Sequence, residues 1–175
     1  KTKQGKNQNY VNNGWDLENR IVWVGEFCEL EIPPIIRAID LMELENNDPI
    51  KVIISSYGGD TYHCFSLYDR LMECKSPIHT YGRGAVMSSG FVTFLAGDVR
   101  DCSENCSFMA HSVSSGSYGK ISEQEVDLAE SQRLNKIMLN ILTERTTKTK
   151  QYWGRAIKHA DRYYNKEQAK KLGVL

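Results

Sequence analysis

The spacing of apolar residues alternates between two periods along the chain, and each period predicts one kind of element. Short runs of β-branched and aromatic residues predict strands at 20–25, 50–55, 78–81 and 106–111. Apolar residues three and four positions apart predict helices at 33–45, around 64–72 and at 89–96. Strands and helices that alternate in this order indicate an α/β domain with a mainly parallel sheet and surrounding helices.

A long helix is predicted from about Ser122 to Arg145. Ser122 and Glu125 match a capping box, and an apolar stripe follows at Val126, Ala129, Leu134, Ile137, Met138, Ile141 and Leu142. At about 1.5 Å per residue, such a helix extends more than about 30 Å, which exceeds what one small domain needs. We therefore expect it to project and to pack on a neighbouring subunit.

The segments on either side of this helix carry weaker patterns. Residues 98–101 predict a turn, and the small, polar and glycine-rich residues 112–120 predict a mobile loop or an edge strand. Near the C-terminus, helices are predicted at about 152–158 and 165–172, and Gly173 closes the second one.

The first 14 residues differ in composition from the rest. Residues 1–14 are basic, rich in amide side chains and nearly free of aliphatic ones. Such a segment buries too little apolar surface to offset the entropy lost on ordering, so it predicts a flexible N-terminal arm. The arm is either a simple tail or a mobile loop at a pore or partner surface. Residues 15–175 show no internal repeat and no linker, and we expect them to form a single domain.

Composition narrows the class of protein. The 175 residues are 41% hydrophobic, enough for a full core, and 22 basic residues balance 22 acidic ones. A net charge of zero does not indicate a nucleic-acid or anionic-membrane partner, and it permits oligomerisation. No apolar run reaches the roughly 20 residues that span a bilayer, and no signal peptide is visible, so we expect a soluble intracellular protein. The five cysteines form no even, dense framework and are expected to be reduced.

The stretch 82–90 carries the chemistry that the rest of the chain is organised around. Glycines and small residues lead to Ser88 and Ser89, where a helix is predicted to begin. One interpretation is that either serine only caps this helix. The other is that a serine at a helix start is a nucleophile, because free backbone N–H groups there stabilise an oxyanion. That use requires a base and an orienting acid, for which His111 and Asp161 are candidates.

A glycine pair in the segment 56–60 adds a second candidate feature. Gly58 and Gly59 lie between the end of a predicted strand and the start of a helix. Backbone N–H groups exposed in such a crevice suit an anion or an oxyanion. A tight turn with no further role explains the same residues equally well.

Taken together and in order, these motifs resemble the proteolytic subunit of the Clp protease, from about Arg20 to Leu175. The family's Ser-Pro-Gly-Gly segment is matched by residues 56–59, and its Gly-x-Ala-x-Ser-x-Gly nucleophile segment by residues 84–90. Its Met-x-His segment is matched by residues 109–111. Asp161 precedes an arginine and a tyrosine, and the ending Gln-Ala-Lys-Lys-Leu-Gly-Val resembles the family's Glu-Ala-x-x-x-Gly-Leu.

The resemblance assigns roles to these residues. It implies that Ser88 is the nucleophile, His111 the general base and Asp161 the group that orients the base, and that the N–H groups of Gly58 and Ser89 form the oxyanion hole. It further implies that substrate is bound in extended form along the stretch 112–120. The residues expected to bind it are Gly59, Ser114, Ser115 and Gly116. No cofactor and no metal is implied.

The resemblance also sets expectations for fold and assembly. It implies a ClpP/crotonase-like fold of repeated β-β-α and βα units, with a handle formed by a strand or loop and the long helix over 112–145. It implies a cytoplasmic or organellar serine endopeptidase that cleaves unfolded polypeptides inside a homo-oligomer. The assembly would be a heptameric ring or a stacked double ring, with an AAA+ unfoldase as partner and neither nucleic acid nor membrane.

Several departures mark a divergent member of the family. Tyr57 replaces a proline, so the loop that holds Gly58 is less rigid by sequence. Ser112 and Val113 replace a Gln-Pro pair, and His159-Ala160 replaces an Asp-Arg pair that links active-site order to ring assembly. The strand residues 51–54 lack the tyrosines that line the unfoldase docking pocket.

Three alternatives remain open at this point. A crotonase-like enzyme that binds acyl-CoA would share the fold and the paired N–H groups, but it has no need of a Ser, His and Asp at these positions. A non-catalytic ring subunit would keep the fold for assembly. Metal binding through Cys102, Cys106 and His111 would require a fourth ligand and matches no common zinc spacing.

Overall fold

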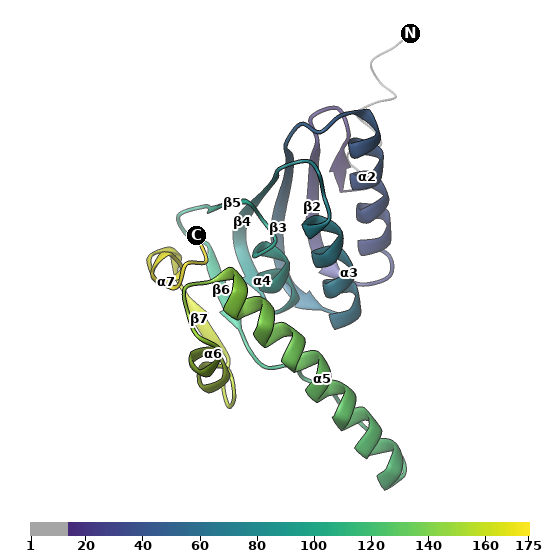
Figure 1. The fold of residues 1–175 in the computed structure, drawn as a ribbon, viewed down its shortest axis with the longest axis vertical. Coiled ribbons are helices and arrows are strands. Elements are labelled where there is room, and N and C mark those ends of the chain that lie inside the picture. The colour runs from purple at the N-terminus through teal and green to yellow at the C-terminus, as the bar shows by residue number, and fades with distance from the viewer. Residues whose placement is uncertain (1–13) are drawn as a thin grey trace.

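A mixed sheet with four parallel strands at its centre organises the molecule (Figure 1). The computed structural model describes residues 14–175, and nearly all of the predicted N-terminal arm, 1–13, lies outside the described residues. The sheet has seven strands, β1 (Trp15–Asp16), β2 (Ile21–Phe27), β3 (Ile50–Gly59), β4 (Ile78–Met87), β5 (Val99–Cys102), β6 (Ser107–Ala110) and β7 (Arg162–Tyr164).

The strand order places the predicted chemistry at one end of the sheet. The order is β1-β2-β3-β4-β6-β7, with β5 paired in parallel beside the first part of β4. Strands β2, β3, β4 and β6 are parallel, whereas β1 and β7 pair antiparallel at the two edges. Because parallel strands end on the same side, the segments that follow β3, β4 and β6 meet there.

The helices follow the strands in alternation. They are α2 (Ile32–Glu45), α3 (Thr61–Met72), α4 (Ser89–Phe94), α5 (Ile121–Arg145), α6 (Lys150–Ala156) and α7 (Lys166–Leu172). Apolar residues of α2, α3 and α4 pack with the alternate residues of the central strands into one core, and a cluster of aromatic rings lies within it at Phe91, Phe94, Phe108 and Trp153. The α/β class and the mainly parallel sheet are thus confirmed.

Helix α5 projects away from the sheet (Figure 1). Its second half is packed, with Leu134, Met138, Ile141 and Leu142 buried, whereas Ile121, Val126 and Leu128 in its first half are exposed. The predicted capping box at Ser122 and Glu125 is wrong. The helix begins at Ile121 with Lys120 as its N-cap, two residues before the predicted cap, and the Glu123 carboxylate accepts the N–H of Lys120 at 2.9 Å.

Two predicted strands end later than expected. Strands β3 and β4 do not end at 55 and 81 but continue through the glycines to Gly59 and Met87. A register shift between Ile54 and Ser56 and positive φ angles at Gly58 and Gly84 allow both strands to bend without losing their partners.

Polar edge segments also form strands. Most of the predicted turn at 98–101 belongs to strand β5, and β7 was not predicted at all. Both are short and rich in charged or polar side chains, so their pairing is set by the neighbouring strands rather than by a local pattern. Within residues 14–175, no helix combines the length and the hydropathy that crossing a bilayer requires.

Candidate active site

Ser88 lies at the sharp turn between β4 and α4. Its backbone has φ 53° and ψ −120°, a conformation that costs an L-residue about 1–3 kcal/mol. The turn is held on both sides, because the Ser88 N–H donates to the Met109 carbonyl at 2.9 Å and the Ser88 carbonyl accepts the N–H of Val92 at 3.1 Å. The Ser88 side chain makes no capping hydrogen bond, so the interpretation as a helix cap does not hold for it.

The Ser88 hydroxyl instead meets His111. Ser88 Oγ lies 2.7 Å from His111 Nε2. Strand pairing brings them together: β4 and β6 are parallel with Met87 opposite Met109, and each functional residue follows within two positions of that pair. His111 is largely covered, with a side chain 25% exposed.

Asp161 reaches the same histidine from the edge strand. It immediately precedes β7, which pairs antiparallel with β6 so that Ala110 is opposite Arg162. This register places Asp161 beside His111. The distance from His111 Nδ1 to Asp161 Oδ1 is 3.6 Å, longer than the roughly 3.2 Å limit of a good hydrogen bond, and the carboxylate is half exposed. The contact between His111 and Asp161 is therefore longer than the contact between His111 and Ser88.

Gly58 approaches Ser88 closely enough that a side chain would not fit. Its φ is 113°, and a Cβ atom added there would lie 2.7 Å from Ser88 Cβ. The Gly58 N–H donates to Ser56 Oγ at 3.0 Å. The Ser89 N–H belongs to the first turn of α4, where backbone donors have no intrahelical acceptor. Of the two predicted oxyanion donors, one is thus already engaged within the chain.

Ser89 and Gly59 hold the glycine segment against the start of α4. Ser89 Oγ donates to the Gly59 carbonyl at 2.9 Å. A Cβ atom on Gly59 would lie 2.5 Å from the Phe27 carbonyl oxygen, so only glycine fits between β2 and the helix. Ser89 therefore has a structural partner, which separates its role from that of Ser88.

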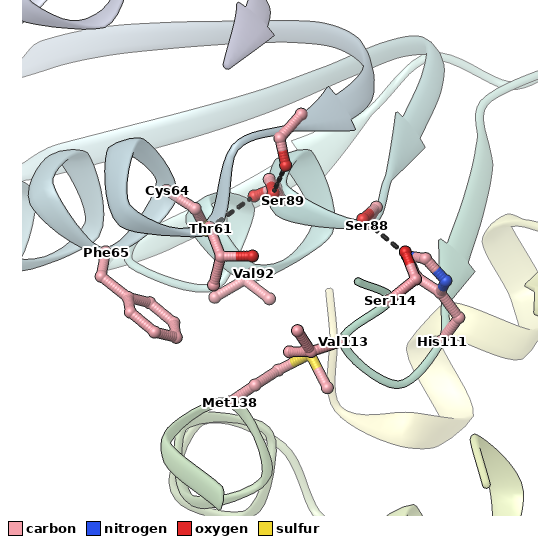
Figure 2. A pocket seen from close by; sticks show the side chains of 11 residues that line it. Thr61, Cys64, Phe65, Ser88, Ser89, Val92, His111, Val113, Ser114 and Met138 are labelled. Atoms are coloured by element: carbon pink, nitrogen blue, oxygen red, sulfur yellow. Dashed lines mark hydrogen bonds between the residues drawn. The ribbon is translucent and has the colours of Figure 1, made fainter. Parts of the chain in front are cut away.

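A pocket opens beside the Ser88–His111 pair (Figure 2). Phe65 and Thr61 line it from α3, Val92 from α4 and Met138 from α5, and none of these side chains is charged. In Figure 2 the side chain of Val92 lies between Ser88 and Phe65, and those of Val113 and Met138 lie below them. The sequence contains no local signal for the contribution of Met138, which comes from a helix 50 residues after Ser88.

The predicted substrate-binding residues divide into two groups. Gly59 and Ser114 line the pocket. Ser115 and Gly116 do not, and Ser115 Oγ instead lies 2.8 Å from the hydroxyl of Ser131 on α5. The stretch between β6 and α5 forms no strand here, which agrees with the loop interpretation of these residues.

Cys64 also lines the pocket but is not a second nucleophile. Its thiol is buried and lies 3.4 Å from the Ser89 carbonyl. Burial raises the pKa of the Cys64 thiol to about 12, so the thiol stays protonated near neutral pH.

The cysteines considered as metal ligands lie apart from His111. Cys106 precedes β6 and His111 follows it, so the strand separates them by roughly 16 Å at about 3.3 Å per residue. Across residues 14–175, no group of three histidine, cysteine or carboxylate side chains is arranged to hold a metal ion. The metal alternative therefore has no structural support.

Comparison with known proteins extends the similarity beyond the site. A model of the Clp protease family matches residues 5–175. The chain is 29% identical over 164 residues to the ATP-dependent Clp protease proteolytic subunit of Deinococcus radiodurans, covering 91% of this chain and 79% of that protein. It is 28% identical over 165 residues to proteolytic subunit 1 of Rhodopirellula baltica, covering 91% of this chain and 71% of that protein.

The fold agrees with a solved structure. A mutant of ClpP1 from Listeria monocytogenes superposes with a TM-score of 0.83 at 23% identity, covering 91% of this chain and 90% of that one. The likeness in fold, the match of the family model over almost the whole chain and the sequence similarity agree with one another. This chain belongs to the Clp protease family, as a distant member of its proteolytic subunits.

Proposed function

We propose that the protein is a serine endopeptidase that hydrolyses peptide bonds of unfolded polypeptides through Ser88, His111 and Asp161. The observation that carries the proposal is the 2.7 Å contact between Ser88 Oγ and His111 Nε2 at a strained turn. Nucleophile and base within hydrogen-bond reach, with a carboxylate beside the other ring nitrogen, are the parts that acyl transfer requires.

The proposed reaction begins with proton transfer. His111 Nε2 removes the proton of Ser88 Oγ as the oxygen attacks the substrate carbonyl, and Asp161 holds the ring tautomer and stabilises the imidazolium. The N–H groups of Ser89 and Gly58 donate hydrogen bonds to the oxyanion, and each lowers the activation barrier by about 3–4 kcal/mol. His111 then protonates the leaving amine, and water releases the acyl group by the reverse steps.

Substrate binding is assigned to the pocket and the loop beside it. The uncharged lining from Thr61, Phe65, Val92 and Met138 suits an apolar side chain next to the cleaved bond. Gly59 and Ser114 would contact the substrate backbone. Ser115 and Gly116 would join only when an extended peptide lies along the loop.

Assembly is the second part of the proposal. We expect copies of the chain to form a ring or a stacked double ring in the cytoplasm or an organellar matrix, with an AAA+ unfoldase that delivers unfolded chains. The exposed apolar residues on the first half of α5 support a contact between subunits, because such residues gain stability when they are covered. No cofactor enters the proposed reaction.

One alternative keeps the fold without catalysis. The 3.6 Å distance between His111 Nδ1 and Asp161 Oδ1 and the engaged Gly58 N–H are the two observations that favour such a structural ring subunit. Such a subunit would assemble and yet fail to react with a probe for activated serines.

The test is labelling with a fluorophosphonate probe, which reacts with activated serine nucleophiles, followed by sizing of the labelled species by light scattering. We expect labelling that is abolished by Ser88→Ala and retained by Ser89→Ala, since Ser89 Oγ is directed to the Gly59 carbonyl. A well-formed ring that does not react would contradict the proposed activity and favour the structural subunit.

A further inference from the structure

Ser56 accepts a hydrogen bond from the Gly58 N–H, which is one of the two donors of the proposed oxyanion hole. It lies two residues before Gly58 on β3, and its Oγ accepts the Gly58 N–H at 3.0 Å. A carbonyl oxygen attacked by Ser88 would need the same N–H, because Gly58 is the backbone segment that touches Ser88. In this conformation, the Ser56 hydroxyl and a substrate oxyanion compete for one donor.

Packing keeps the Ser56 hydroxyl in place. The residue is 1% exposed, and a Cβ atom on Gly90 of α4 would lie 3.1 Å from Ser56 Cβ. Ser56 also sits just after the register shift in β3, opposite Val86 of β4. Neighbours on the strand and on the helix therefore restrict the backbone of Ser56, and burial leaves its side chain little room to move.

The peptide that carries the competing N–H can change its orientation, although Ser89 holds the next residue, Gly59, through its carbonyl. Gly58 and Gly59 both have positive φ angles, 113° and 141°, which glycine adopts without a steric penalty. Tyr57 between Ser56 and Gly58 is 82% exposed and adds no packing that would hold the peptide. A small rotation of the Gly58 peptide is thus the movement that redirects its N–H from Ser56 to an oxyanion.

We propose that Ser56 is a positioning residue that holds the Gly58 N–H in a resting orientation, and that reaction at Ser88 requires this N–H to exchange the Ser56 hydroxyl for the oxyanion. The inference rests on the proposed function. Ser56 then controls the second oxyanion donor. With the Ser56–Gly58 hydrogen bond in place, acylation of Ser88 is slower than it would be without that bond.

The test compares Ser56→Ala with Ser55→Ala. Ser55 is the exposed neighbour on the same strand, and its hydroxyl makes no hydrogen bond with the described part of the chain. Removing the Ser56 hydroxyl is expected to raise kcat on a fluorogenic peptide, and the rate of fluorophosphonate labelling, by about two- to tenfold, the equivalent of one net hydrogen bond. KM is expected to stay constant, because the donor acts in the transition state. Ser55→Ala is expected to match the wild type.

Two further measurements keep the inference open to refutation. Ser56→Cys retains the size of the side chain with a weaker acceptor and is expected to give a smaller rise, which covers the case that the alanine variant misfolds. Amide hydrogen exchange at Gly58 reports the hydrogen bond without catalysis, and it is expected to quicken in Ser56→Ala but not in Ser55→Ala.

The outcomes separate this inference from the proposed function. Labelling of the wild type that depends on Ser88, with an unchanged or lower rate in a folded Ser56→Ala, would overturn the role of Ser56 alone. No labelling of the wild type together with labelling of Ser56→Ala would support it. If neither protein reacts, both the proposed function and the exchange of donors are refuted.

Discussion

Single atoms decide whether the proposed site works, and Gly58 is the clearest case. Its φ of 113° and the 2.7 Å approach of an added Cβ to Ser88 leave no room for a side chain. Gly58→Ala is expected to shift the segment away from Ser88, to cost about 1–3 kcal/mol in folding stability and to lower kcat by about 100-fold or more. Peptide hydrolysis and thermal unfolding measure the two effects.

Gly154→Ala is the matched control for this substitution. Gly154 lies in α6, and an added Cβ there meets nothing within 4 Å. Alanine in a helix is expected to stabilise the fold by up to about 1 kcal/mol and to leave hydrolysis unchanged. Equal activity of the two variants would show that the close approach of Gly58 to Ser88 has no role in the reaction.

The sequence predicts which residues come together at the site better than it predicts the distances and hydrogen bonds between them. Ser88 and His111 follow the neighbouring parallel strands β4 and β6, so their convergence at one end of the sheet follows from strand order. Asp161 precedes the exposed edge strand β7, which the sequence pattern did not predict. The Ser56–Gly58 hydrogen bond and the 3.6 Å gap at Asp161 depend on side-chain rotation and on the register of an edge strand. No local pattern in the sequence encodes either of them.

Pairs of elements are connected by a few partly buried polar groups, and Glu43 on α2 is one of them. It accepts hydrogen bonds from Arg70 on α3 at 2.8 Å and from the N–H of Ser76 at 2.9 Å. Burial alone raises the pKa of the Glu43 carboxyl, but these hydrogen bonds outweigh burial, and the pKa lies below its usual value.

Glu43→Gln is therefore expected to destabilise the fold in a pH-dependent way. A lowered folded-state pKa means that the stabilisation is present above the unfolded-state value of 4.5 and is lost as the pH falls through the folded-state pKa. The difference in free energy of unfolding should be about 1–3 kcal/mol at pH 7 and should shrink in acid. Urea unfolding at several pH values measures it.

Glu45→Gln serves as the control for the loss of one charge on α2, because Glu45 is exposed at the end of that helix. It is expected to change the free energy of unfolding by less than about 0.5 kcal/mol. A difference between Glu43→Gln and wild type that stays constant down to pH 3 would contradict the role of the charged carboxylate.

Elements also differ in how well the sequence predicts them. The long helix has nearly the predicted range, and each central strand begins within one residue of its predicted start, although β3 and β4 continue beyond their predicted ends. Strand β5 has charged residues at two of its four positions and forms because β4 offers a free edge from His79 to Gly82. Such strands depend on tertiary pairing, which a local pattern does not contain.

The shape of the molecule suggests how copies meet. Helix α5 has one half packed on the body and one half that extends from it (Figure 1). Leu142 in the packed half is fully buried, whereas Leu128 in the projecting half is 58% exposed. Covering exposed apolar side chains of the projecting helix with another copy would stabilise an assembly, which agrees with the proposed ring.

Leu128→Asp tests this contact. Within one subunit the substitution is expected to change stability by less than about 0.5 kcal/mol, because the side chain touches little of its own chain. In an assembly it would bury an unpaired charge against apolar residues, so the mass measured by sedimentation velocity is expected to fall to that of a smaller oligomer. The control is Asn140→Asp, which adds the same charge at an exposed position on the packed half and keeps an acceptor for Lys150. If both variants sediment like the wild type, the projecting half of α5 takes no part in assembly, and the contact between copies must lie elsewhere on the surface.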